Sequence, residues 1–168
     1  MSMQVKLRAI EPEDLDYLYR IENDNELWKV GVTNVPYSRS ALADYICTCT
    51  SDIYQDRQVR LMVESDKGET IGIVDIVDFN PQHRRAEIGL VIDSGHRGKG
   101  YGEAAMRKLM RYAHDVLHLH QLYALISIDN NDSIHLFEKL AFQRGSLLKE
   151  WLFDGDKYHD ALVMQSFL

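Results

Sequence analysis

The sequence has few cysteines and prolines and contains no long apolar run. A membrane-spanning helix needs about 20 consecutive apolar residues, and no stretch approaches that length. The N-terminal segment also lacks the uninterrupted apolar core of a signal peptide. We therefore expect a cytoplasmic protein with no membrane partner.

The two cysteines exclude a disulfide framework, because Cys47 and Cys49 lie two residues apart in a predicted helix and point to opposite sides of it. A C-x-C metal site would need further ligands, so two buried helix cysteines are the simpler interpretation. The histidines at 114, 118 and 120 lack an accompanying carboxylate at ligand spacing. We expect no bound metal.

A general basic character is missing as well, because the formal net charge is −7. This charge argues against nucleic acid as a partner and favours cationic molecules. Hydrophobic residues make up 45% of the chain, and no repeat, low-complexity run or linker interrupts it. We predict that residues 1–168 form a single domain with a substantial core.

Alternating and amphipathic patterns predict the order of secondary structure. Strands are expected at 4–10, 59–65, 70–79, 86–93, 122–128, 147–153 and 158–167, and helices at 11–23, 38–54, 103–117 and 131–142. This order predicts a mixed α/β fold, a mostly antiparallel sheet of six to seven strands with helices on both faces and one β-α-β crossover. Residues 24–37 are expected to form a loop that carries Trp28.

The stretch "HRGKGYG", residues 96–102 and called here the glycine loop, joins a predicted strand to a predicted helix. Glycines adopt backbone angles closed to other residues and let a ligand approach the main-chain N–H groups. The free N–H groups of a helix's first turn bind anions. With Arg97 and Lys99 adding charge, the loop predicts a phosphate site.

Two motifs resemble those of the GNAT N-acetyltransferases. Arg97, Gly100 and Gly102 match the family's R/Q-x-x-G-x-G/A pattern, and "NNDSIHLFEKLAF" at 130–142 is similar to its N-x-x-A-I-x-L-Y-E-K-L-G-F helix. The likeness covers essentially the whole chain. It is greatest to the branch of spermidine acetyltransferases and ribosomal-protein N-terminal acetyltransferases, and residues 73–92 look most like the spermidine enzymes.

The resemblance implies acetyl-CoA as the acyl donor and assigns residues to it. The backbone of the glycine loop would hold the pyrophosphate, strand 86–93 would pair with pantetheine, and Gly89 could start a bulge there. Asn130 could bond pantetheine or simply cap its helix. The implied contacts with acetyl-CoA are Leu90, Val91, Ile92, Arg97, Gly98, Lys99, Gly100, Tyr101, Gly102, Asn130, Ser133 and Phe137.

Acetyl transfer to an amine requires a base, because a primary amine is mostly protonated at neutral pH. Glu87 matches the position at which related enzymes place an acidic residue facing the acceptor. It could equally form a salt bridge with Arg84 or Arg85. Asp75 and Asp78 have opposite strand parity, so at most one of them can join Glu87 in an acidic pocket, and ion pairing is expected for the other.

Position 137 departs from the family pattern, because many relatives have there a Tyr that protonates the CoA thiolate. Phe137 has no proton to give, so we assign it only a packing contact with CoA. Another group or water would then protonate the thiolate, or it would leave unaided.

Three functions remain open from the sequence. The chain could acetylate a small amine such as a polyamine, which suits its acidic character. It could acetylate the N-terminus of a protein partner in a groove near Trp28, or bind acyl-CoA without catalysis. A homodimer or higher homo-oligomer is compatible with all three.

Overall fold

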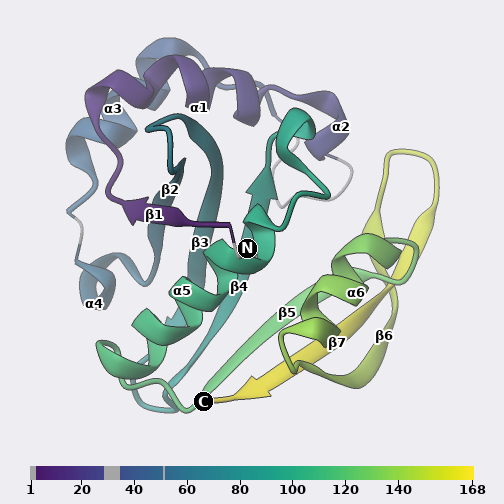
Figure 1. Cartoon of the computed structure of the whole chain (residues 1–168). Coiled ribbons are helices and arrows are strands. Elements are labelled where there is room, and N and C mark those ends of the chain that lie inside the picture. The colour runs from purple at the N-terminus through teal and green to yellow at the C-terminus, as the bar shows by residue number, and fades with distance from the viewer. Residues whose placement is uncertain (1–2, 29–34, 51) are drawn as a thin grey trace.

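The structure is a computed structural model, and it describes residues 3–28, 35–50 and 52–168. Within these ranges, seven strands form one sheet in the order β1-β2-β3-β4-β5-β7-β6, and only the β4–β5 pair is parallel (Figure 1). The predicted mixed, mostly antiparallel fold is therefore confirmed. The strands are β1 (Val5–Arg8), β2 (Val59–Ser65), β3 (Thr70–Asn80), β4 (Arg85–Ile92), β5 (Gln121–Ser127), β6 (Gln143–Phe153) and β7 (Tyr158–Phe167).

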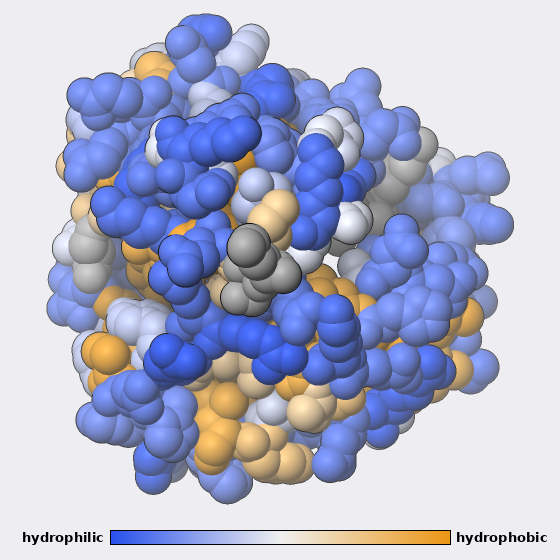
Figure 2. Space-filling view, viewed as in Figure 1, coloured by the Kyte–Doolittle hydropathy of each residue, from blue (hydrophilic) through white to orange (hydrophobic). Residues whose placement is uncertain are grey.

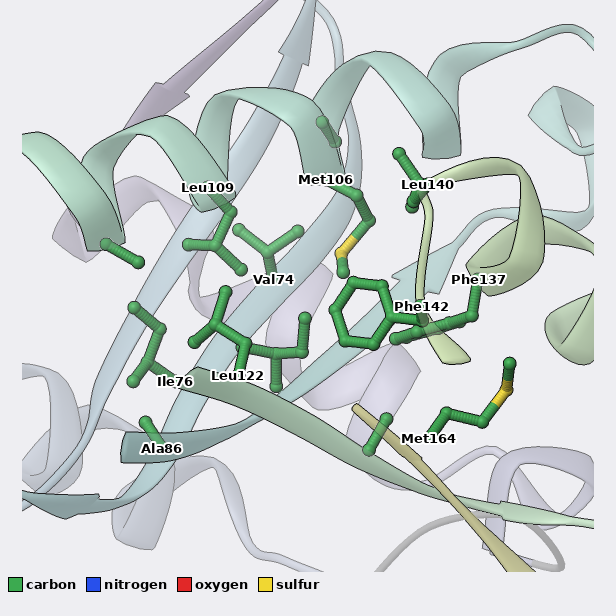
Figure 3. Close-up of a cluster of buried hydrophobic side chains, with 14 of the residues drawn as sticks. Val74, Ile76, Ala86, Met106, Leu109, Leu122, Phe137, Leu140, Phe142 and Met164 are labelled. Carbon is green, nitrogen blue, oxygen red and sulfur yellow. The ribbon is translucent and has the colours of Figure 1, made fainter. Parts of the chain in front are cut away.

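Helices cover both faces of the sheet, as the sequence predicts. On one face, α1 (Leu15–Glu22) and α3 (Arg39–Thr48) bury Leu18 and Leu42 against Met62 and Ile73 of the sheet. On the other face, α5 (Tyr101–Asp115) and α6 (Asn131–Lys139) enclose the larger core, part of which is drawn in Figure 3. Short elements complete the described chain: η1 (Pro12–Asp14), α2 (Asn25–Trp28), α4 (Ile53–Asp56) and η2 (Ser94–His96).

The helix predicted at 38–54 is interrupted. It ends at Thr48, Cys49 has extended backbone angles, and a new helix begins after Asp52, whose side chain accepts a hydrogen bond from the N–H of Tyr54. A capping aspartate of this kind favours a helix start over a helix interior. The expected burial of the cysteines was wrong, because Cys47 is exposed and Cys49 is only half-buried.

Strands β4 and β5 separate soon after they meet, as Figure 1 shows. They pair only from Arg85 and Gln121 to Glu87 and Tyr123, whereas β4 continues beside β3 as far as Ile92. The bulge expected at Gly89 is wrong, because Gly89 pairs regularly with Asp75. The strands part because β4 follows β3 while β5 follows β7. From residue 88 onward, the β5 side of β4 therefore has no strand partner in the part of the chain that the structure describes.

Candidate active site

The glycine loop presents a row of unused main-chain donors. Gly98 and Gly100 have φ angles of 71° and 88°, which favour glycine, and Gly100 is the N-cap of α5. Among the described residues, no backbone hydrogen bond is donated by the N–H groups of residues 98–103. These groups lie at the positive end of a helix of 15 residues. The loop thus has the geometry of an anion cradle.

The two cationic side chains of the glycine loop donate hydrogen bonds to main-chain carbonyls just before the loop. Arg97 Nε donates to the carbonyl of Ile92 at 2.8 Å, and Lys99 Nζ donates to the carbonyl of Gly95 at 2.7 Å. The anion site is therefore chiefly main chain, with the two charges close by. Sequence reasoning missed Tyr17 of α1, whose hydroxyl donates to Asp93 just before the loop at 3.1 Å. No sequence signal marks that contact, because it joins residues far apart in the chain.

The residues assigned to pantetheine lie on both sides of the opening between β4 and β5. Leu90, Val91 and Ile92 belong to the stretch of β4 that pairs with β3 but no longer with β5. An indentation with hydrophobic atoms in it lies between α5 and α6 on this side of the molecule (Figure 2). A strand edge offering free N–H and C=O groups, next to an anion cradle, fits the amides and phosphates of acetyl-CoA.

Two residues of the second motif have structural roles. Asn130 is the N-cap of α6, and its side chain accepts a hydrogen bond from the N–H of Ser133 at 3.2 Å. Phe137 is 5% exposed and packs edge-on against Phe142, with ring centroids 4.9 Å apart (Figure 3). The capping role of Asn130 is thus observed, and Phe137 contributes to the core.

Glu87 lies where β4 and β5 separate, opposite Val77 of β3 and Tyr123 of β5. It is half-buried, and no described cation pairs with it. The alternative salt bridge with Arg84 or Arg85 is not formed among the described residues: Arg84 Nε donates to the carbonyl of His118, and Arg85 has no ion pair there. Burial raises the pKa of Glu87, and the negative charge of Asp78 raises it further.

The two aspartates of β3 behave differently. Asp75 is paired with Arg60 at 2.8 Å, which confirms ion pairing for one of them, and Arg60 also contacts Glu22. Asp78 lies in a bulge between Val77 and Asn80 with a φ of 48°, and its carboxylate accepts a hydrogen bond from the Tyr123 hydroxyl at 2.5 Å. The parity argument was wrong here, because the bulge turns Asp78 toward the side of Glu87.

A pocket of about 240 Å³ lies between α1, α3 and the sheet. Its lining includes the aromatic residues Tyr37 and Tyr45, the acidic residues Glu22 and Asp75 with their common partner Arg60, and Val77. Because Val77 is the β3 neighbour of Glu87, the pocket adjoins Glu87 on the same sheet face. The site therefore has a basic anion cradle at one end and acidic and aromatic side chains at the other.

Trp28 is half-buried, and its Nε1 donates to the carbonyl of Glu22 at 2.7 Å. The loop predicted at 24–37 was wrong for Asn25–Trp28, which form α2, and residues 29–34 of it lie outside the described residues. Within the described ranges, no group of three or more His, Cys, Asp and Glu side chains could hold a metal ion. No helix in the described part of the chain is long and apolar enough to cross a membrane.

Comparison with known proteins agrees with this geometry. The chain is 34% identical to spermidine N(1)-acetyltransferase of Escherichia coli K12, over 97% of this chain and 86% of that protein. A crystal structure of spermidine N-acetyltransferase from Vibrio cholerae in complex with CoA and spermine superimposes with a TM-score of 0.89 at 26% identity, covering 98% of this chain and 95% of the other. A ribosomal-protein-serine acetyltransferase of E. coli K12 is 23% identical over 95% of this chain and 90% of its own length. Residues 4–143 match the family model of the acetyltransferase (GNAT) domain, so the chain belongs to the GNAT family and is an acetyl-CoA-dependent acetyltransferase.

Proposed function

We propose that the protein transfers the acetyl group of acetyl-CoA to a primary amine of a polyamine such as spermidine. The observation that carries this proposal is Glu87, an acidic side chain that no described cation pairs with, placed where β4 and β5 part. Asp78 lies beside it, and in the adjoining pocket Glu22 and Asp75 share Arg60 as their partner, so that pocket adds one further negative charge. A flexible polycation is the acceptor class that such an acidic surface attracts.

Different residues of the site have different roles in this proposed reaction. Bound acetyl-CoA supplies the thioester, held by the N–H groups of the glycine loop and the free edge of β4. Glu87 removes a proton from the acceptor ammonium, directly or through water, so that the nitrogen lone pair can attack the thioester carbonyl. Burial and the charge of Asp78 raise the pKa of Glu87, which makes it a stronger base than an exposed glutamate. Phe137 cannot protonate the departing thiolate.

The proposal is tested by measuring CoA release from acetyl-CoA with spermidine, spermine, and a peptide that begins with serine. We expect acetylation of the polyamines at least tenfold faster, as kcat/KM, than acetylation of the peptide. Faster acetylation of the peptide would overturn the proposal in favour of a protein acetyltransferase. Tight acetyl-CoA binding without turnover of any amine would instead identify an acyl-CoA-binding module.

We further propose that the protein forms a homo-oligomer in the cytoplasm. A structure of the V. cholerae spermidine N-acetyltransferase is dodecameric. In this chain the edge strand β6 exposes Leu147, Trp151 and Phe153, apolar groups of the kind that an interface buries. Cys47 and Cys49 are free thiols, which suits a reducing compartment.

A further inference from the structure

Asp78 has a positive φ, unlike the residues of a regular strand. Its φ of 48° is uncommon for a residue other than glycine, and it lies at the register shift between Val77 and Asn80. Bulges of this kind often redirect a side chain beside an active site. Here the bulge brings the carboxylate to Tyr123 of β5, two strands away from β3.

Tyr123 fixes the orientation of that carboxylate. Its hydroxyl donates to Asp78 Oδ2 at 2.5 Å, and its backbone is paired with Glu87 at the last point where β4 and β5 are neighbours. Side chains from three adjacent strands thus converge at the opening between β4 and β5. A charge-assisted hydrogen bond is among the stronger ones, so the tyrosine limits the motion of Asp78.

The charges around this cluster leave it negative. Asp75 is neutralised by Arg60, whereas no described cation pairs with Asp78 or Glu87. Arg85, two residues before Glu87, acts on Tyr123 from a distance and forms no ion pair in the described part of the chain. Asp78 and Glu87 are therefore two neighbouring carboxyl groups that can both contact a cationic group of a bound substrate.

We propose that Asp78, oriented by Tyr123, is a positioning residue that holds the ammonium group of the acceptor against Glu87. The inference rests on the proposed function, because it assumes a cationic amine acceptor. The carboxyl group of Asp78 retains the cation, while the proton passes from the amine nitrogen to a carboxylate oxygen of Glu87. The negative charge of Asp78 also makes Glu87 a stronger base, because a nearby like charge disfavours its ionised form.

The test compares wild type with Asp78→Asn and Tyr123→Phe, and uses Asp66→Asn as a control. Asp66 is an exposed residue in the turn between β2 and β3, so this control makes the same change of net charge elsewhere. We expect Asp78→Asn to raise the acceptor KM at least tenfold and to move the acidic limb of the kcat/KM profile to lower pH. Tyr123→Phe should change the acceptor KM and the acidic limb in the same directions but by smaller amounts. Asp66→Asn should change neither the KM nor the acidic limb.

A second measurement does not depend on turnover. The carboxyl carbon of Glu87 can be titrated by ¹³C NMR in protein labelled at glutamate, with its signal assigned by its absence in Glu87→Gln. We expect a lower pKa for Glu87 in Asp78→Asn than in wild type. An unchanged pKa together with an unchanged acceptor KM in a folded Asp78→Asn protein would overturn the inference. If polyamines are not acetylated at all, the proposed function fails, and the titration still decides whether Asp78 acts on Glu87.

Discussion

At the scale of single residues, replacing Glu87 tests whether this side chain is the catalytic base or has a structural role. Glu87→Gln preserves size and hydrogen bonding but removes the basicity, so we expect kcat to fall about a hundredfold while the affinity for acetyl-CoA is retained. In wild type, activity should fall as the pH drops through the raised pKa of Glu87, because the protonated acid cannot accept a proton. Steady-state rates from mildly acidic to alkaline pH measure both effects.

The thermal stability of Glu87→Gln tests the alternative, that Glu87 has a structural role. Glu87 is a half-buried carboxyl group with no described partner cation, so its replacement by Gln removes a desolvated charge. We therefore expect an unchanged or higher Tm for Glu87→Gln at neutral pH. A loss of Tm together with undiminished turnover would show that Glu87 has a structural role.

The glycine loop allows a matched comparison of two glycines. Gly98 has a φ of 71° and Gly68, in the turn between β2 and β3, has a φ of 77°; an added Cβ would meet nothing within 4 Å at either position. An alanine at either site should cost about 1–2 kcal/mol of stability through its backbone conformation. Only Gly98→Ala places a methyl group beside the free N–H groups of residues 98–103.

We therefore expect Gly98→Ala to weaken acetyl-CoA binding at least tenfold, or about 1.4 kcal/mol, and Gly68→Ala to leave it unchanged. Isothermal titration with CoA measures both variants. Equal CoA affinities in the two variants would contradict the placement of the pyrophosphate at the glycine loop.

At the scale of secondary-structure elements, one histidine connects the β6–β7 hairpin to the segment before α6. His159 contacts Asp129 through Nδ1 at 2.7 Å and Asp154 through Nε2 at 2.5 Å. Both ring nitrogens can donate only when the imidazole is protonated. Accordingly, the hydrogen bond with Asp154 and then that with Asp129 raise the pKa of His159.

The sign of the pH dependence follows from this shift. A raised pKa means that the contribution to stability is fully present below the ordinary histidine pKa of 6.5 and is lost as the pH rises through the higher folded-state value. Asp154 stays ionised throughout that window, because its own pKa is lowered by hydrogen bonds from the backbone of Lys157, from His159 and from the backbone of Asp156. We expect the Tm difference between wild type and His159→Gln to shrink as the pH rises from 6 to 9. A difference that stays constant over this range would rule out an ionic contact.

The same scale shows what sequence could and could not predict. Strand alternation and the glycine loop are local patterns, so the sheet and the cradle could be anticipated from them. The break after Thr48 depends on a cap at Asp52, and the bulge at Asp78 depends on pairing with a neighbouring strand. The contact between Asp78 and Tyr123 spans 45 residues, and no local pattern encodes it.

At the scale of the whole molecule, the edge strand β6 is the surface that an assembly would cover. Leu147, Trp151 and Phe153 are 42%, 57% and 60% exposed on the last strand of the sheet. A row of unpaired backbone groups with apolar side chains favours association with another chain. The register of β6 with β7 is irregular between Leu148 and Leu152, so this edge is not a flat template for open-ended stacking. A closed oligomer of defined size is the expected outcome.

Trp151→Glu should therefore dissociate the oligomer, because a carboxylate buried at an apolar interface without a partner is strongly unfavourable. Val116→Glu is the matched control, since Val116 is 58% exposed at the end of α5, away from the sheet edge. Light scattering coupled to size-exclusion chromatography should show a multiple of 19.5 kDa for wild type and Val116→Glu, and a smaller mass for Trp151→Glu. A wild-type mass of 19.5 kDa across the micromolar range, or an unchanged mass for Trp151→Glu, would show that β6 is not the interface.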